Sequence, residues 1–352
     1  MKNKKYKVAV VNGRFEIFHK GHWSCVLRAL DVAEQVIIIV GSANASRSIT
    51  NPFTAEERIR VINRILVNKL SKPDYNRVKI TVVNDNIRDT VWQADIRDCV
   101  YPHSDKDVIM VGANKDADSW WLDVFGWDVE SVEIYKDENG KSLSSSRLRD
   151  IYFKSDETEL AILSEYLGWE QIDFLNEFVF SDHFKQLKSD YDYKVSELKK
   201  FDSYPYKGTL NCSTADAVVI CNGHVLVTTR GNMPGLGLYA LPGGHKNDDE
   251  TYLDCAIREL REEIKLHVPL KVIRGSIKDQ KIFDAPKRSS ILCKPTLGVY
   301  IEILPDANGS LPRVAVGDEI AKVEWMPLNI ARRNQNLFFD DHWQIISYFT
   351  GL

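Results

Sequence analysis

Three glutamates at helical spacing are the residues best suited to chemistry in this chain. Glu259, Glu262 and Glu263 stand at positions i, i+3 and i+4, so their carboxylates share one face of a helix. Like charges at this spacing repel by about a few tenths of a kcal/mol per pair. A hard divalent cation removes that cost, because Mg²⁺ binds carboxylate oxygens together with the oxygens of substrate phosphates. The alternative is a solvated acidic helix face, but Gly244 and Glu250, at fixed distances before the helix, favour the metal.

Two histidines form a second candidate site. His19 and His22 are three residues apart, shortly after an apolar run at residues 7–11 and the glycine Gly13. Glycine lets the backbone approach a phosphate closely, and two histidines at a helix start can face the same anion. A lone histidine is more often structural. The pair in His-Lys-Gly-His, just past a first strand, favours a phosphate site.

A run of serines followed by arginines is the third candidate. Serines can cap a helix whose free N–H groups point at phosphates, and arginines supply positive charge. The alternative is a capped surface helix. The residues of this group are Ser144, Ser145, Ser146, Arg147 and Arg149.

Alternating strands and helices over residues 1–154 must position the histidines and the serine–arginine group. Strands are predicted at 7–11, 35–41, 78–83, 108–111 and 129–134, and helices at 23–33 and from Thr54 to about residue 68. Thr54 and Glu57 have the spacing of a capping box. Continuous apolar strands separated by helices predict an α/β fold with a doubly wound parallel sheet, whose ligands lie beyond the carboxyl ends of the strands.

The remainder of the chain divides into a helical part and a mixed part. Aromatic residues and leucines at spacings of three and four predict a helical connector over residues 155–202. Short alternating strands around the glutamate helix predict an α+β domain over residues 203–352. We therefore predict three parts, 1–154, 155–202 and 203–352.

The N-terminal motifs resemble those of nucleotidylyltransferases with a Rossmann-like domain. The relevant runs are Gly-Arg-Phe-Glu-Ile-Phe-His-Lys-Gly-His (13–22) and Ser-Leu-Ser-Ser-Ser-Arg-Leu-Arg (142–149). Together with Asn-Pro-Phe-Thr-Ala-Glu-Glu-Arg (51–58), the first run is similar to the archaeal-type nicotinamide mononucleotide (NMN) adenylyltransferases. The resemblance implies that His19 and His22 are catalytic and stabilise charge at the α-phosphate. It implies that ATP and its phosphates are bound by Gly13, Arg14, Phe15, His19, His22, Ser144, Ser145, Ser146, Arg147 and Arg149.

Two further segments resemble the mononucleotide-binding parts of that family. In Asn-Ile-Arg-Asp-Thr-Val-Trp (86–92), Trp92 is expected to stack on nicotinamide, with core packing as the alternative. Lys115 and Asp116 begin a run similar to one in bacterial members fused to Nudix domains, and we expect them to bind NMN. Glu16 and Ile17 stand where the family commonly has Gln-Pro, and we predict no chemistry for them.

The glutamate helix resembles the Nudix box, G-x5-E-x7-R-E-U-x-E-E-x-G-U with U aliphatic. The box implies hydrolysis of a nucleoside diphosphate linked to another group. Lys265 replaces its last glycine, which would end the helix in a left-handed conformation, so we expect a cost of about 1 kcal/mol. By resemblance, Glu262 and Glu263 are catalytic, and the metal ligands are Gly243, Glu259, Glu262 and Glu263, with Glu319 as a candidate fourth carboxylate. Glu319 would be a metal ligand or a base, with a surface acid as the alternative. A Phe-Asp-Ala-Pro-Lys-Arg-Ser run similar to one in ADP-ribose-binding Nudix domains implies binding by Phe283, Asp284 and Arg288.

Composition limits the remaining possibilities. The chain has 352 residues and a formal net charge of -4, which allows two cores and gives no general attraction to nucleic acid or anionic membranes. Its six cysteines have neither Cys-x-x-Cys pairs nor zinc spacing, so we expect reduced thiols. No apolar run of membrane length or signal peptide is predicted. We expect a cytoplasmic protein with small-molecule partners, no nucleic acid and no membrane, and leave a homo-oligomer open.

The two motif sets together imply a bifunctional NMN adenylyltransferase/Nudix hydrolase. One reaction would join ATP and NMN into NAD and pyrophosphate. The other would cleave ADP-ribose to AMP and ribose 5-phosphate with Mg²⁺, or with Mn²⁺ as an alternative ion. Two other functions stay open: transfer to a flavin or pantetheine precursor with a Nudix domain for a different nucleoside diphosphate derivative, or a non-catalytic ADP-ribose-sensing regulator. The intact acids and mildly acidic charge argue against the regulator.

Overall fold

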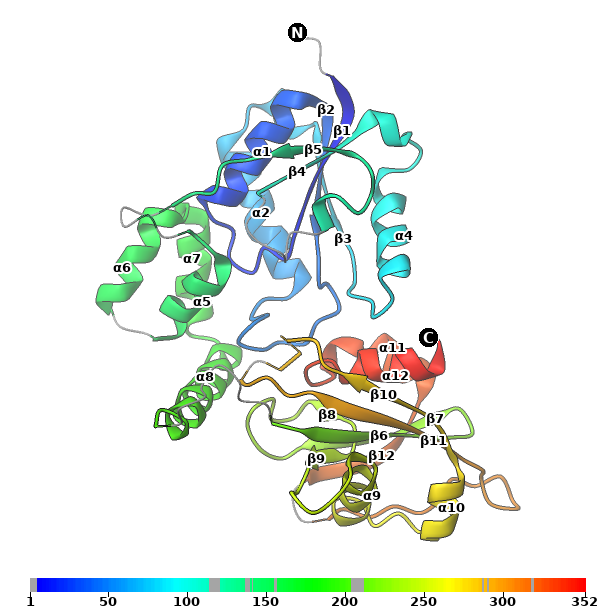
Figure 1. Ribbon diagram of the computed structural model, residues 1–352. Helices are drawn as coiled ribbons and strands as arrows, with labels where there is room; N and C mark the ends of the chain where they lie inside the picture. The colour runs from blue at the N-terminus through cyan, green and yellow to red at the C-terminus, as the bar shows by residue number, and fades with distance from the viewer. Residues whose placement is uncertain are drawn as a thin grey trace. The chain divides into compact units, whose positions relative to one another are not determined.

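The chain forms two compact units, Met1–Gln186 and Leu187–Leu352 (Figure 1). The computed structural model describes residues 5–113, 121–136, 140, 142–154, 157–203, 212–286, 288–289, 291–317 and 320–352. The three-part division at residues 154 and 202 stays a prediction. Among the described residues, no helix combines the length and the apolar character needed to cross a membrane.

A parallel sheet forms the centre of the first unit. Its strands are β1 (Tyr6–Gly13), β2 (Ala33–Val40), β3 (Val78–Val82), β4 (Val108–Gly112) and β5 (Asp128–Ser131). They are ordered β3-β2-β1-β4-β5, and each neighbouring pair is parallel. This arrangement confirms the predicted doubly wound fold. The strand order reverses direction between β1 and β4, where such sheets bind ligands.

Helices cover both faces of this sheet. Val8 and Val10 of β1 belong to one buried cluster with Ile96 and Val100 of α4 (Asp89–Val100). Since successive strand residues point to opposite faces, the buried intervening residues of β1 require cover on the other side. Figure 1 shows α1 (Lys20–Val32) across the sheet from α4. The other helices are α2 (Ala55–Lys69), α3 (Lys72–Tyr75), η1 (Asp105–Asp107), α5 (Ser145–Lys154), α6 (Glu157–Tyr166), α7 (Trp169–Phe178) and α8 (Asp182–Lys200), the last of which crosses into the second unit.

The predicted capping box at the start of α2 is confirmed. Thr54 Oγ1 accepts a hydrogen bond from Glu57 N at 3.3 Å, and Glu57 Oε2 accepts one from Thr54 N at 2.8 Å. Arg47 also donates two hydrogen bonds to the Glu57 carboxylate, each 2.8 Å long. The first turn of α2 is therefore fixed in place by local interactions.

A mixed sheet forms the centre of the second unit. Its order is β10-β11-β6-β7-β12, with β8 paired to β7 and β9 paired to β6. Only β11 and β6 are parallel among these described pairs. The strands are β6 (Thr214–Cys221), β7 (His224–Arg230), β8 (Tyr239–Ala240), β9 (Gly243–His245), β10 (Ile277–Phe283), β11 (Thr296–Ile303) and β12 (Ile320–Pro327). This mixed sheet with helices confirms the predicted α+β class.

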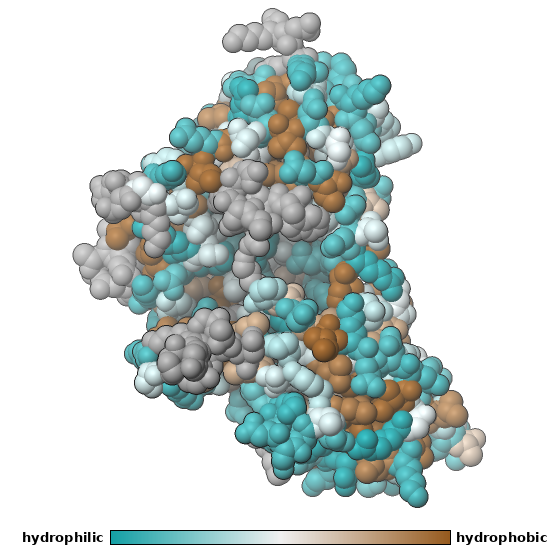
Figure 2. Space-filling view, in the orientation of Figure 1, coloured by the Kyte–Doolittle hydropathy of each residue, from teal (hydrophilic) through white to brown (hydrophobic). Residues whose placement is uncertain are grey.

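Two helices cover opposite faces of the mixed sheet. Residues Cys255 and Leu260 of α9 (Tyr252–Glu262) share a buried cluster with Val299 of β11. The neighbouring Gly298 instead lies against side chains of α12 (His342–Thr350). The remaining helices are α10 (Leu270–Gly275), α11 (Leu328–Arg333) and η4 (Gln335–Leu337). Hydrophilic residues occupy most of the visible surface of each unit, with apolar areas between them (Figure 2).

Candidate functional sites

The loop after β1 occupies the ligand-binding edge of the parallel sheet. We call residues 13–18 the phosphate loop. Phe15 has a φ of 54° and is only 4% exposed. A left-handed conformation is unusual for an aromatic residue and costs about 1–3 kcal/mol unless its surroundings enforce it. The contacts of the loop must therefore compensate for this strain.

Three helices anchor the backbone of the phosphate loop. Each contributes one side chain to a different peptide group, so the loop is held at its beginning and its end. The anchors are Arg58 Nη1 to Arg14 O (2.6 Å) from α2, Ser145 Oγ to Ile17 O (3.2 Å) from α5, and Gln171 Oε1, which accepts from Phe18 N (3.0 Å), from α7. Satisfied buried backbone groups restrict the loop to one conformation.

His19 and His22 occupy the start of α1. His19 Nδ1 accepts a hydrogen bond from Gly21 N at 3.1 Å, and His22 Nδ1 accepts one from His19 N at 3.3 Å. Their rings are stacked with centroids 3.7 Å apart. Because Nδ1 is the acceptor in each neutral ring, the proton lies on Nε2. Both histidines therefore carry an Nε2–H donor of the kind that binds a phosphate oxygen.

The serine run at the start of α5 supports the loop and its cations. Ser144 Oγ accepts a hydrogen bond from Arg147 N at 3.3 Å, as a helix-capping residue does. Ser145 anchors the phosphate loop. Ser146 Oγ accepts a hydrogen bond from Arg149 Nη2 at 3.1 Å. The structure thus brings this predicted group to the phosphate loop, while direct contacts with phosphate stay a prediction.

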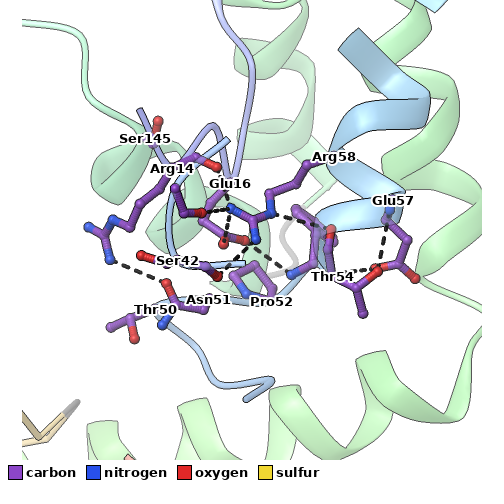
Figure 3. A network of polar contacts seen from close by, with 12 residues as sticks. Arg14, Glu16, Ser42, Thr50, Asn51, Pro52, Thr54, Glu57, Arg58 and Ser145 are labelled. Atoms are coloured by element: carbon purple, nitrogen blue, oxygen red, sulfur yellow. Dashed lines mark hydrogen bonds and ion pairs between the residues drawn. The ribbon is translucent and has the colours of Figure 1, made fainter. Parts of the chain in front are cut away.

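Two arginines give this site a positive character. Burial lowers the pKa of Arg149 to about 10, and repulsion from Arg14 acts in the same direction, whereas Glu16 opposes it. Arg14 Nη1 donates a hydrogen bond to Asn51 Oδ1 at 3.3 Å (Figure 3). Cations that repel one another at a ligand-binding edge favour an anionic ligand.

The residues predicted to bind NMN are only partly described. Trp92 lies on α4, half-buried against the apolar cluster of the sheet, with its ring centroid 5.7 Å from that of Phe125. Part of the ring therefore packs on the core, which was the alternative to a role in binding. Stacking on nicotinamide stays a prediction. Lys115 and Asp116 lie outside the described residues.

In the second unit an arginine binds most of the Nudix-box acids. We call Glu250, Glu259, Glu262 and Glu263 the acid cluster. Arg258 donates two hydrogen bonds to Glu250, at 2.7 and 2.9 Å, and one each to Glu259 and Glu262, both 2.8 Å long. The hydrogen bonds from Arg258 lower the pKa of Glu250 to about 2. An internal cation thus offsets the repulsion expected between these carboxylates.

Two members of the acid cluster converge on the glycines of β9. Glu263 Oε2 accepts a hydrogen bond from Gly243 N at 3.1 Å. A β-carbon on Gly244 would collide with the Glu259 carboxylate. Glycine is therefore required for the close approach of the carboxylate to the backbone, which explains the fixed glycine before the box.

The donor set fits a hard divalent cation, although its side chains are not gathered around one point. Over the described ranges, no three His, Cys, Asp or Glu side chains are arranged to hold a metal ion. Glu319, the predicted fourth carboxylate, is not among the described residues. Carboxylates and the backbone carbonyl of Gly243 are oxygen donors of the type that Mg²⁺ and Mn²⁺ prefer. Arg258 contacts one oxygen of Glu259 and one oxygen of Glu262, so its hydrogen bonds do not engage the second oxygen of either carboxylate.

The expectation for Lys265 was wrong. The helix ends with Glu263 at φ −71°, in the right-handed region, and Lys265 has no positive φ. Ile264 bridges to Val316, and Lys265 N donates a hydrogen bond to Ala315 O at 3.0 Å. Because the chain leaves the helix directly into this extended pairing, it needs no left-handed residue. The predicted cost of about 1 kcal/mol therefore does not arise.

A pocket of about 300 Å³ adjoins the acid cluster within the second unit. Arg288, predicted to bind ADP-ribose, lines it and donates hydrogen bonds of 2.7 and 2.9 Å to Asp341. Phe283 is instead buried, with its ring 5.6 Å from that of Tyr348. Neither Phe283 nor Asp284 is among the lining residues. The charged lining residues are Asp216, Arg230, Glu263, Arg288, Lys294 and Asp340.

Several pocket residues had no signal in the sequence. Arg230 lies 4.0 Å from the centre of the Phe339 ring. Asp340 has a φ of 44°, and burial, followed by repulsion from Asp341, raises its pKa to about 7. His342 Nδ1 accepts a hydrogen bond from Leu241 N at 2.8 Å, and burial lowers its pKa to about 3. These residues come together only through the fold, from segments about a hundred positions apart.

Comparisons with known proteins agree with the two predicted domain types. Residues 10–151 match the cytidylyltransferase-like family, and residues 212–349 match the NUDIX domain family. The chain is therefore a nucleotidyltransferase-type domain joined to a Nudix domain. It is 30% identical over 190 residues to the nicotinamide/nicotinic acid mononucleotide adenylyltransferase of Acinetobacter baylyi, covering 53% of this chain and 94% of that protein. The chain belongs to this adenylyltransferase family.

Two crystal structures from Francisella tularensis resemble the whole chain. Both are described as a bifunctional NMN adenylyltransferase/ADP ribose pyrophosphatase, and the second is complexed with AMP and a manganese ion. Their sequence identities are 27% and 26%, and each has a TM-score of 0.86. Each comparison covers 98% of this chain and 99% of the other. The resemblance predicted from the two motif sets is confirmed.

Proposed function

We propose that the chain makes NAD from ATP and NMN in its first unit and hydrolyses ADP-ribose in its second. The named relatives support this bifunctional enzyme class, as the sequence predicted. The observation that carries the first activity is a pair of imidazoles with Nε2–H donors beside a phosphate loop anchored by three helices. The roles of individual residues are our inference from the geometry.

In the first reaction the protein positions the reactants and stabilises charge. The phosphate of NMN attacks the α-phosphorus of ATP, a P–O bond forms, and the bond to pyrophosphate breaks. His19 and His22 would donate hydrogen bonds to oxygens that gain charge in the transition state. Arg14 and Arg149 would bind the departing pyrophosphate. Phosphoryl-type transfers need little covalent participation by the protein.

In the second reaction the acid cluster would hold a divalent metal. The comparison with a manganese complex supports dependence on a divalent ion, and we infer that the physiological ion is Mg²⁺. When bound, such an ion supplies an activated water and neutralises phosphate charge. Glu259, Glu262 and Glu263 would supply its oxygen ligands. Glu319 is a further proposed ligand, and Lys115 and Asp116 stay proposed NMN ligands in the first unit.

The composition of the second pocket fits a sugar nucleotide diphosphate. Arg230 and Lys294 provide positive charge for phosphates, whereas Asp216 and Asp340 provide acceptors for hydroxyl or amino groups. Glu263 lines the same pocket, so a bound diphosphate would lie next to the acid cluster. These features support ADP-ribose as the substrate, giving AMP and ribose 5-phosphate.

Product analysis tests the proposal directly. The full chain is incubated with ATP and NMN, and separately with ADP-ribose, each with Mg²⁺ and with a chelator. We expect NAD and pyrophosphate from the first mixture, and AMP and ribose 5-phosphate from the second. Replacing NMN with flavin or pantetheine phosphates tests the other acceptors. An equal or better rate with one of these acceptors contradicts the assignment to NAD synthesis.

A further inference from the structure

A buried carboxylate lies behind the phosphate loop. Glu16 is 1% exposed and follows Phe15, the residue with the strained backbone. Its Oε2 accepts a hydrogen bond from Phe53 N at 3.1 Å, and its Oε1 lies 3.4 Å from Arg58 Nη1. Burying a charged group is costly unless partners stabilise it. A charged residue in such a place requires an explanation beyond loop closure.

Arg58, the partner of Glu16, joins three segments of the first unit. Its guanidinium donates hydrogen bonds to the carbonyls of Arg14 (2.6 Å), Gly41 (2.8 Å) and Ser42 (3.1 Å); Figure 3 shows Arg58 between Arg14 and Ser42. These carbonyls belong to the phosphate loop and to the segment after β2. Arg58 itself lies on α2, whose start is fixed by the capping box. The guanidinium therefore links the backbone of the phosphate loop to residues 41–42 after β2 and fixes their relative position.

Charge alone would oppose this arrangement. Arg14, Arg58 and Arg149 are all cations; burial lowers the pKa of Arg58 and Arg149, and repulsion from Arg14 acts in the same direction. Glu16 pairs directly with Arg58, and the charges of Arg149 and Arg14 also act on it. Its negative charge offsets their mutual repulsion without occupying the outer side of the loop, where a phosphate would bind. Asp85 and Glu56 also act on Arg58.

We propose that Glu16 is a positioning residue for nucleotide transfer. Its ionised carboxylate, held by Phe53 N–H, keeps the Arg58 guanidinium against the carbonyls of Arg14, Gly41 and Ser42. The phosphate loop is thereby held in the conformation that binds the triphosphate of ATP. This inference rests on the proposed NAD synthesis. It assigns a role to a residue for which the sequence predicted no chemistry.

Ionisation of Glu16 makes the proposal testable by pH. Burial raises the pKa of Glu16 to about 7, while Arg58, Phe53 N–H, Arg149 and Arg14 all act to lower it. Below this pH the carboxyl group gains a proton and no longer attracts Arg58. ATP binding should therefore weaken as the pH falls through about 7. Phosphates also gain a proton near pH 6, so wild type must be compared with a variant that lacks the Glu16 charge.

Glu16→Gln is that variant, because it keeps the side-chain shape and an acceptor for Phe53 N–H. The Michaelis constant for ATP, that for NMN, and kcat are measured on the full chain from pH 6 to 9. At pH 8 we expect the Michaelis constant for ATP to rise about tenfold and the other two constants to change less than about threefold. The ratio between variant and wild type should shrink toward pH 6. Calorimetric titration with ATP should give the same pattern without turnover.

A double-mutant cycle tests the route through Arg58. Arg58→Lys keeps the charge but cannot make the same set of hydrogen bonds. Both substitutions together should raise the Michaelis constant for ATP no more than Arg58→Lys alone, because they act on one interaction. Multiplicative effects would overturn the proposed route. Glu34→Gln is the matched control, since Glu34 is a half-exposed residue of the same unit paired with Lys7, and it should leave all constants unchanged.

Two further outcomes contradict the proposal. One is an unchanged Michaelis constant for ATP in Glu16→Gln at every pH. The other is an equal loss in kcat and in both Michaelis constants with a lower unfolding midpoint, which indicates a role in folding only. ADP-ribose hydrolysis by the same samples checks the second unit. A wild-type chain that makes no NAD contradicts the proposed function instead, and ATP titration still tests Glu16.

Discussion

The two candidate sites differ in how they hold several charges of the same sign close together. Around the phosphate loop, Arg58 and Arg149 are buried, and side chains from α2, α5 and α7 fix the loop backbone by hydrogen bonds. In the acid cluster, the Glu262 side chain is 62% exposed, and Arg258 holds the carboxylates. In the first site, helices hold the loop through hydrogen bonds to its backbone. In the second, one arginine bridges the acids, and no three His, Cys, Asp or Glu side chains of the described residues are arranged to hold a metal ion.

This difference predicts how each site responds to substitution. In a preorganised site, ligand binding depends on residues that hold the ligand-contacting groups in place. A substitution that does not contact the ligand can therefore weaken its binding. In a site assembled around an ion, losing one ligand removes the chemistry while the fold remains intact. Because the sites lie in separate units, each activity serves as the internal control for the other.

The largest effect is expected from Glu263→Gln. Glu263 lines the pocket and belongs to the acid cluster, and an amide is a much poorer metal ligand than a carboxylate. ADP-ribose hydrolysis should fall roughly 10³-fold, corresponding to about 4 kcal/mol. NAD synthesis, measured on the same sample, should be unchanged. Unaltered hydrolysis at saturating Mg²⁺ would refute the metal role.

His22→Ala should have the next largest effect. Removing one donor to the developing charge typically costs about 10²–10³ in kcat. His22 also accepts the hydrogen bond from His19 N, so the start of α1 loses part of its cap. NAD synthesis should fall by this factor, with ADP-ribose hydrolysis intact. Loss of both activities would show that the two sites are not independent.

Trp92→Ala should affect one substrate selectively. If the exposed part of the ring stacks on nicotinamide, the Michaelis constant for NMN should rise about tenfold, which corresponds to roughly 1.4 kcal/mol. The constant for ATP should change little. Steady-state kinetics with each substrate varied in turn distinguish this result from core packing, which predicts equal changes in both constants.

Local and short-range features of the molecule could be predicted from the sequence. The apolar strands, the capping box at Thr54 and the helical spacing of the glutamates all depend on neighbours within a few positions. The parallel, doubly wound class follows from continuous apolar strands separated by helices. These parts of the prediction therefore agree with the structure.

Interactions across long stretches of chain could not be predicted in this way. Glu16 gains its role from Arg58, 42 positions later. Lys265 is accommodated by pairing with Ala315, which no local helix rule can anticipate. Likewise, the carboxylate of Asp340 and the guanidinium of Arg230 meet in one pocket only after the mixed sheet forms. In each case the partner residue is distant in the sequence and is brought close only by the tertiary structure.

The smallest expected effect concerns stability. Because burial raises the pKa of Glu16 from 4.5 to about 7, the folded protein holds a proton that the unfolded chain has lost between these pH values. The stabilisation from this proton is complete below about pH 4.5 and is lost as the pH rises through about 7. Relative to Glu16→Gln, wild type should therefore lose up to roughly 3 kcal/mol of unfolding free energy across this window.

Chemical denaturation at pH 5, 6, 7 and 8 measures this difference, with Glu34→Gln as a control that should follow wild type. A variant that is more stable at pH 8 yet binds ATP more weakly would sharpen the contrast between the two sites. It would show that the charge behind the phosphate loop reduces stability and is retained for preorganisation. A variant that loses stability at every pH would show instead that the ion pair with Arg58 outweighs the cost of burial. The first result would show that the Glu16 charge favours ATP binding but lowers the stability of the fold.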